Sequence, residues 1–119
     1  MSRARIVTDQ AGRFYGIEWV CPGCQLLHHV IPADWTPEGL QRSPHLTGAS
    51  WGFNGNLDRP TFTQSVLSRW NEWTGKDTPP RACVCHSFVR DGRIEFLSDC
   101  THALAGQTVD LPEIDPDQG

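Results

Sequence analysis

Potential zinc ligands gather at two separate places in this chain of 119 residues. Cys21 and Cys24 enclose Pro22-Gly23 in a Cys-Pro-Gly-Cys turn. Pro and Gly allow a tight reversal that points both sulfurs at one ion, so we predict a zinc knuckle at this turn. Far downstream lies the second set of candidates, which is Cys83, Cys85, His86, Cys100 and His102. A structural zinc site needs four ligands, which are typically thiolates or imidazoles. The Cys-Pro-Gly-Cys turn supplies only two, so a complete site requires the two places to meet in the fold.

The downstream candidates lie on a predicted β-hairpin over residues 82–102. Residues that favour β-structure flank Asp91-Gly92, which is a strong signal for a two-residue hairpin turn. Closing the chain at this turn opposes Val89 to Ile94, Ser87 to Phe96, Cys85 to Ser98 and Cys83 to Cys100.

The predicted register sorts these side chains between two faces. Directly opposed residues share a face, and neighbours along a strand point to opposite faces. Cys85 and Cys100 therefore lie on one face with Cys83, and His102 joins them if the strand continues for two more residues. His86 and Asp99 lie on the other face. This separation argues against a cysteine nucleophile at Cys85 that is activated by His86.

Two kinds of zinc site fit these residues. A closed structural site would use four thiolates, most simply those of Cys21, Cys24, Cys85 and Cys100. An open catalytic site would use three protein ligands and keep a water molecule, with a nearby group to move its proton. The candidates for this proton transfer are Glu18, His86 and Asp99. One of His28 and His29 also faces the knuckle and could serve as a ligand.

The remaining sequence predicts a mainly β fold of antiparallel hairpins joined around the zinc knuckle. Segments 14–20, 26–31, 61–67 and 108–111 are predicted strands, and 70–80 is a predicted exposed loop. Nine Pro and eleven Gly residues favour short elements and many turns. We expect one zinc-binding domain over 1–119 whose ends, 1–12 and 113–119, are loose.

The composition narrows the classes of function. A net charge of −4 argues against a nucleic-acid-binding surface. The chain contains no long apolar run and no secretory signal, so we expect neither a membrane span nor export. The expected location is a reducing cytoplasm, which favours metal binding over disulfides for the five Cys residues.

Four motifs together resemble a family of small uncharacterised proteins of bacteriophages and prophages, sometimes labelled ammonia monooxygenase. They are Cys21-Pro22-Gly23-Cys24, Trp51-x-Phe-Asn-Gly with Pro60-Thr61-Phe62, Cys85-His86-Ser87-Phe88, and Asp99-Cys100-Thr101-His102. The resemblance covers residues 14–112. It implies the cytoplasm of a bacterial host cell as the location, a link to bacterial ubiquitin-like conjugation genes, and a metal-dependent peptidase activity. It also implies that Cys100 is replaceable by Ser, which makes His102 the better fourth ligand.

Two functional hypotheses follow from these observations. The first is a zinc-dependent hydrolase of the peptidase or isopeptidase type that acts on a protein tail. The second is a zinc-stapled protein that binds a host or phage protein without catalysis, because a small domain gains stability from a metal. Both hypotheses expect another protein as the partner.

Overall fold

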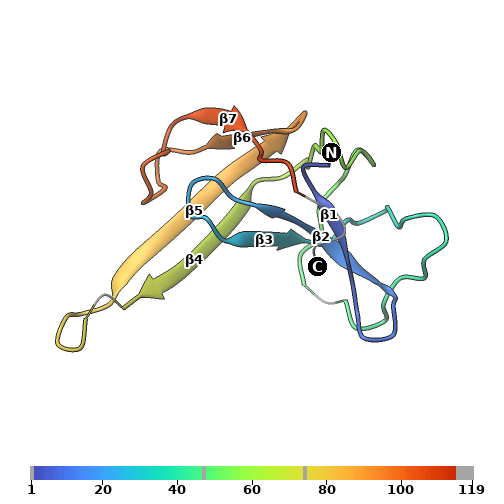
Figure 1. Cartoon of the computed structure of the whole chain (residues 1–119), viewed down its shortest axis with the longest axis horizontal. Coiled ribbons are helices and arrows are strands. Elements are labelled where there is room, and N and C mark those ends of the chain that lie inside the picture. Colours follow the sequence, from blue (N-terminus) through green and yellow to red (C-terminus); the bar gives the residue numbers. More distant parts are fainter. Residues whose placement is uncertain (1, 47, 74, 115–119) are drawn as a thin grey trace.

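The structure is a computed structural model that describes residues 2–46, 48–73 and 75–114. These residues form two antiparallel sheets and no helix, which confirms the predicted mainly β fold (Figure 1). The first sheet has the order β1-β2-β3 and the second has the order β4-β5-β6-β7. The strands are β1 (Arg5–Thr8), β2 (Phe14–Val20), β3 (Leu27–Val30), β4 (Val66–Glu72), β5 (Arg81–Arg90), β6 (Arg93–Phe96) and β7 (Thr108–Asp110). A helix that could span a membrane is absent from the described residues.

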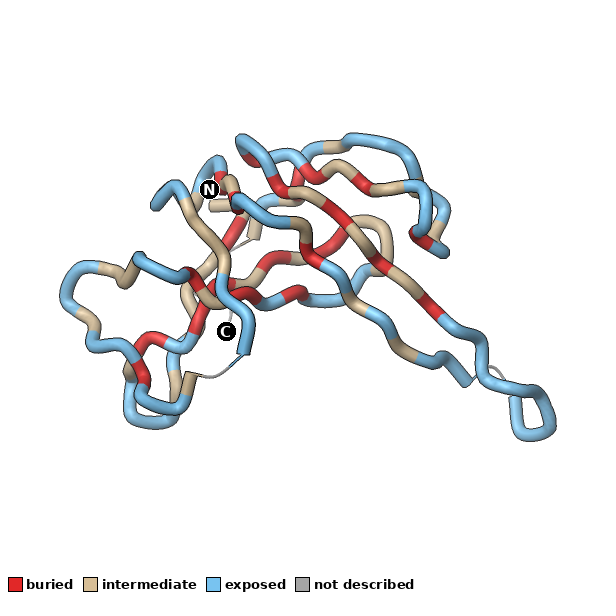
Figure 2. The backbone as a smooth tube through the Cα atoms, turned by 180° about the vertical axis from the view of Figure 1, so that it is seen from behind, coloured by how far each residue is buried: buried red, intermediate tan, exposed pale blue. Residues whose placement is uncertain are grey.

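The core lies between the inner faces of the two sheets. On β5, buried and partly exposed residues alternate from Cys83 to Val89, as the period of a strand requires (Figure 2). On β2, Ile17 and Trp19 are fully buried. Trp19 stacks on Phe62 with a distance of 5.2 Å between the ring centroids. The same alternation that fills the core therefore decides which side chains of β2 and β5 meet between the sheets.

The hairpin of β5 and β6 follows the predicted register up to the end of β6. Val89 is opposed to Ile94 and Ser87 to Phe96. The predicted pairing beyond Phe96, of Cys85 with Ser98 and of Cys83 with Cys100, is wrong. The Leu97 N–H donates to the His86 carbonyl at 2.9 Å, and then the chain turns at residues 98–99. It returns to β5 only where the Thr101 N–H donates to the Val84 carbonyl at 2.9 Å, so Cys85 does not oppose Ser98.

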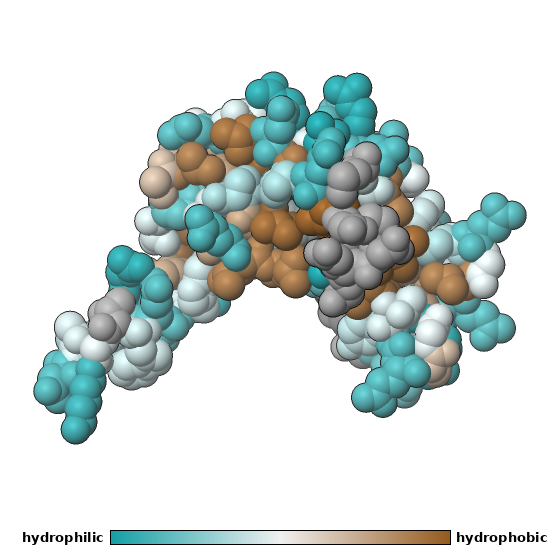
Figure 3. Space-filling model, viewed as in Figure 1, coloured by the Kyte–Doolittle hydropathy of each residue, from teal (hydrophilic) through white to brown (hydrophobic). Residues whose placement is uncertain are grey.

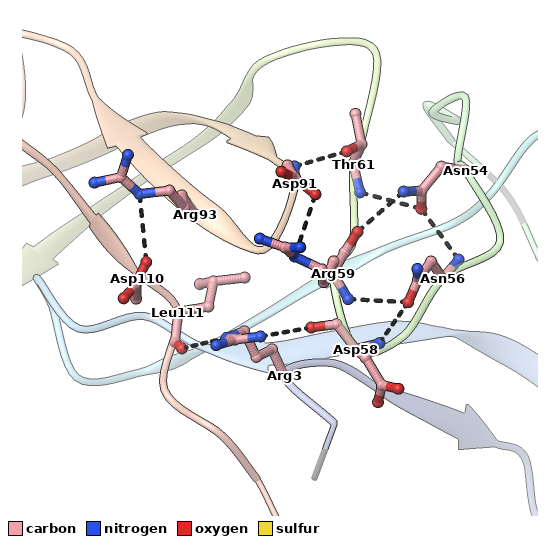
Figure 4. A network of polar contacts seen from close by, with 10 residues as sticks. All are labelled: Arg3, Asn54, Asn56, Asp58, Arg59, Thr61, Asp91, Arg93, Asp110 and Leu111. Atoms are coloured by element: carbon pink, nitrogen blue, oxygen red, sulfur yellow. Dashed lines mark hydrogen bonds and ion pairs between the residues drawn. The ribbon is translucent and has the colours of Figure 1, made fainter.

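The N-terminal segment is part of the fold. We expected residues 1–12 to be loose, but β1 pairs with β2 and Ala4 is fully buried. The Arg3 guanidinium donates to the Leu111 carbonyl at 3.2 Å (Figure 4). Of the other predicted loose end, residues 115–119 lie outside the described residues. The Ile114 N–H before them donates to the Ser2 carbonyl at 2.7 Å.

The strand expected over 61–67 begins later than predicted and continues into the predicted loop 70–80. Phe62 donates its N–H to the Val89 carbonyl at 2.9 Å, the chain bends at residues 63–64, and β4 then starts at Val66. The Thr61 hydroxyl accepts the Asp91 N–H at 2.7 Å, and this contact joins the preceding loop to the β5–β6 turn (Figure 4). Ser65 lies between this loop and Val66, the first residue of β4.

Candidate metal cluster and candidate catalytic triad

Four side chains from both sheets converge in the core at the knuckle. The ligand atoms of Cys21, Cys24, His28 and Cys85 all lie within 4.8 Å of one another. The Sγ atoms of Cys21 and Cys85 are 3.7 Å apart, and Cys24 Sγ lies 3.3 Å from His28 Nε2. Three thiols and one imidazole match a structural zinc site in number and chemistry. This cluster could hold a metal ion, and its residues join the first sheet to the second.

The strand period explains why His28 and not His29 belongs to the metal cluster. His28 is opposed to the buried Trp19 on β2 and is 6% exposed. Its Nδ1 atom is held by the Ser68 hydroxyl on β4 at 3.2 Å, which leaves Nε2 directed at the thiols. His29 is exposed on the opposite face, where its ring stacks on Tyr15.

The three thiols of the metal cluster differ in the direction of their pKa shifts. The hydrogen bond from the Cys85 thiol lowers the pKa of Cys21 to about 3, and the same hydrogen bond raises the pKa of Cys85. Burial raises the pKa of Cys24. A metal ion binds thiolates, so its binding would release protons from Cys24 and Cys85. Cys21 supplies the thiolate that needs no such change.

Cys100 was a predicted ligand, and the structure places it against the backbone of β5. Its Sγ accepts the His86 N–H and donates to the His86 carbonyl, both at 3.2 Å. It also forms a second group with Cys85 and His102 whose ligand atoms lie within 4.8 Å of one another. Its two hydrogen bonds show that this thiol bridges the irregular end of the hairpin, where regular ladder pairing has stopped.

His102 was also a predicted ligand, and its hydrogen bonds point to a different role. Its Nδ1 atom accepts the Leu104 N–H at 3.2 Å, so the neutral ring carries its proton on Nε2. Nε2 lies 3.6 Å from Cys85 Sγ and is positioned to donate to this sulfur. The ring also touches the knuckle, because a Cβ atom on Gly23 would lie 2.3 Å from His102 Cε1.

The opposite face of β5 carries a second constellation. His86 Nε2 lies 3.0 Å from Ser65 Oγ, and His86 Nδ1 lies 3.1 Å from Asp99 Oδ2. The side chains of His86 and Asp99 are 24% and 51% exposed, so the group opens to solvent. A serine hydroxyl on one imidazole nitrogen and a carboxylate on the other is the arrangement of a Ser-His-Asp triad. Such triads are recognised by geometry, because their order along the chain differs between folds.

His86 lies on the regular strand β5, whereas Ser65 and Asp99 lie on irregular segments beside it. Ser65 precedes β4, in which Leu67 is opposed to His86. The turn at residues 98–99, which replaces the predicted pairing, brings Asp99 to His86. The Trp51 indole N–H donates to the Ser65 carbonyl at 3.1 Å and fixes the backbone at the serine.

Glu18 was the third predicted catalytic residue, and it lies in neither constellation. It alternates with the buried Trp19 on β2 and forms an ion pair with Arg5 on β1. His86 and Asp99 were predicted from the sequence, whereas Ser65 was not, because residues 63–66 carry no nucleophile motif such as Gly-x-Ser-x-Gly.

Comparison with known proteins assigns the chain to a family. Residues 2–97 match the model of BubE, described as the bacterial ubiquitination-like system serine protease. The matched segment contains Ser65 and His86, and Asp99 lies two residues beyond it. No curated protein and no solved structure matches the chain. The link to ubiquitin-like systems that the resemblance implied is thereby confirmed, and the chain belongs to the BubE family of bacterial ubiquitination-like system serine proteases.

Proposed function

We propose that the protein is a serine protease in which Ser65 is the nucleophile, His86 the general base and Asp99 the residue that orients His86. The observation that carries this proposal is the pair of hydrogen bonds on the two nitrogens of His86, at 3.0 Å to Ser65 and 3.1 Å to Asp99. The family description supports the same chemistry. A zinc-bound water is not needed for hydrolysis by this constellation.

In the proposed mechanism, each proton transfer involves a named atom. Ser65 Oγ attacks the carbonyl carbon of the substrate while His86 Nε2 takes the hydroxyl proton. The same nitrogen then donates this proton to the leaving amine. Asp99 accepts a hydrogen bond from Nδ1–H and stabilises the imidazolium that forms. A water molecule, deprotonated by His86 in the same way, then hydrolyses the acyl group from Ser65.

The substrate class follows from the family. The family acts in a ubiquitination-like system, so we infer that the substrate is a protein or a protein conjugate of such a system.

The five cysteines are all free, which supports a location in the reducing cytoplasm of a bacterial cell. An origin in a phage or prophage stays a prediction from the sequence.

The metal cluster has a structural role in this proposal. We infer that Cys21, Cys24, His28 and Cys85 bind one Zn²⁺, because three thiols and one imidazole complete a tetrahedral site. Four protein ligands leave no position for a reacting water. A bound ion would hold the knuckle of the first sheet against β5 and, through the hydrogen bond from His28 to Ser68, against β4.

A fluorophosphonate probe tests the assignment of the nucleophile, because it phosphonylates activated serines. We expect labelling of the wild-type protein at Ser65, no labelling of Ser65→Ala, and an unchanged Tm for this variant. The matched control is Ser98→Ala, which changes an exposed serine beside Asp99 and keeps the labelling. Absence of labelling in the wild-type protein would favour the alternative hypothesis of a zinc-stapled binding protein.

A further inference from the structure

The hydrogen-bonding pattern of β5 shows which of its groups face β4. The carbonyls of Val84 and His86 accept N–H groups from Thr101 and Leu97, so both residues direct their backbone groups toward the β6 side. Backbone groups alternate in direction along a strand. The residues of β5 whose backbone groups face β4 are therefore Cys83, Cys85 and Ser87.

The free edge of β4 follows from this alternation. Trp70, Ser68 and Val66 are opposed to the β5 residues that face β4, so they make the ladder hydrogen bonds. Leu67, Arg69 and Asn71 direct their N–H and C=O groups away from β5. These three residues are exposed, and within residues 48–73 and 75–114 no strand pairs with β4 on that side. Figure 1 shows β4 as the outer strand of its sheet.

The free edge of β4 begins next to Ser65, the proposed nucleophile. Ser65 lies two residues before Leu67, so its backbone groups also point away from β5, and its carbonyl accepts the Trp51 indole N–H. Leu67 is thus the first residue beyond Ser65 with open backbone groups, and it lies opposite His86. An extended peptide can add to such an edge as a further strand, with affinity supplied by main-chain hydrogen bonds.

We propose that the substrate is an extended, unfolded peptide segment that pairs antiparallel with the free edge of β4. This inference rests on the proposed function of Ser65. In the antiparallel direction the residues before the scissile bond lie along Leu67 and Arg69, and the scissile carbonyl reaches Ser65. The acyl part of the substrate therefore stays on the strand after the leaving group departs. A substrate bound in this way must be extended, so we expect flexible protein tails as substrates and not folded segments.

The far end of this edge offers a partly apolar anchor. A cavity of about 650 Å³ is lined by Trp70, Trp73 and Leu26 together with polar residues that include the ion-paired Glu72 and Arg81. Trp73 is 72% exposed and Leu26 51% exposed. Figure 3 shows hydrophobic surface in the hollow between the β4–β5 hairpin and the rest of the molecule. At about 3.4 Å per residue, the cavity would receive a large apolar side chain about five to seven residues before the scissile bond.

The test uses a backbone change that spares the β4–β5 ladder. In Arg69→Pro the lost N–H points away from β5, a position at which an edge strand tolerates proline. Arg69→Ala is the matched control, because it removes the side chain and keeps the N–H. The substrates are randomised peptides long enough to span β4, with cleavage sites mapped by mass spectrometry. Fluorophosphonate labelling and Tm report whether the triad and fold are intact.

We expect Arg69→Pro to keep its labelling rate and lose about tenfold or more in kcat/KM for the peptides relative to Arg69→Ala, which lacks the same side chain but keeps the N–H. Peptides that lack residues before the cleaved bond should be poor substrates of the wild type. Equal peptide cleavage by Arg69→Pro and Arg69→Ala overturns the edge proposal. So does a wild-type protein that labels at Ser65 and cleaves no extended peptide. A wild-type protein that does not label refutes the proposed function itself.

Discussion

Cys85 and His86 are neighbours on β5, and their side chains serve different constellations on opposite faces of one sheet. Cys85 Sγ lies 3.7 Å from Cys21 Sγ in the metal cluster, whereas His86 Nε2 lies 3.0 Å from Ser65 Oγ in the triad. The strand period alone separates the two sites. Because one strand carries both, a metal bound inside the core would fix the position of His86, the proposed general base, on the outer face.

Replacing each of these two neighbours should have a separate effect. Cys85→Ser removes a thiolate ligand, so we expect loss of bound zinc and a Tm lower by at least about 10 °C, since the binding free energy of a structural metal contributes to folding. His86→Ala should keep its zinc and its Tm and lose fluorophosphonate labelling. Zinc content is measured on the purified variants by elemental analysis. Full zinc retention by Cys85→Ser would contradict the assigned cluster.

Asp99→Asn tests the orienting role of the carboxylate. The neutral amide can donate an N–H to Nδ1, which would hold His86 in the wrong tautomer, and it does not stabilise the imidazolium, so we expect kcat to fall by about 10³- to 10⁴-fold. Asp99 is half exposed and outside the metal cluster, so zinc content and Tm should stay unchanged. Rates are measured with a cleaved peptide, and Ser98→Ala serves as the control in the same turn. Unchanged kcat in the variant would remove Asp99 from the triad.

Substitutions at Cys100 distinguish a ligand from a backbone bridge. Cys100→Ser keeps a group that can donate to the His86 carbonyl and accept the His86 N–H, so zinc content and labelling should stay near the wild-type values. Cys100→Val removes both hydrogen bonds and should lower the free energy of unfolding by about 1–3 kcal/mol. Urea denaturation and elemental analysis measure these effects. Loss of zinc in Cys100→Ser would make Cys100 a ligand.

The contact between the knuckle and His102 predicts a coupled pair of mutations. In Gly23→Ala the new methyl group would lie 2.3 Å from His102 Cε1. The ring cannot easily move, because it packs edge-on against Phe96 at 4.4 Å between centroids. We expect a loss of about 1–3 kcal/mol in the free energy of unfolding.

Adding His102→Ala should relieve the Gly23→Ala clash, so the double variant should lose less stability than the sum of the single variants. Chemical denaturation of the three variants and the wild type measures this coupling. Additive losses would show that the Gly23 methyl group does not act through His102.

The sequence by itself determined the elements whose signals are local. Asp91-Gly92 set the turn and register of the β5–β6 hairpin, because a two-residue turn fixes which residues oppose each other. The strand period then placed Cys85 on the buried face of β5 and His86 on the other. The Cys-Pro-Gly-Cys turn indicated a metal site at the knuckle, where the metal cluster forms.

Only the tertiary structure decided which distant residues complete the two sites. Ser65 lies beside His86 because a hydrogen bond holds the preceding loop against the β5–β6 turn, and this loop leads to the start of β4. Asp99 reaches His86 because the hairpin ends in a turn where regular pairing was expected. His28 enters the metal cluster because β3 packs its buried face toward Ser68 of β4. Contacts between residues far apart in sequence depend on how sheets pack, and short-range patterns carry no information about that packing.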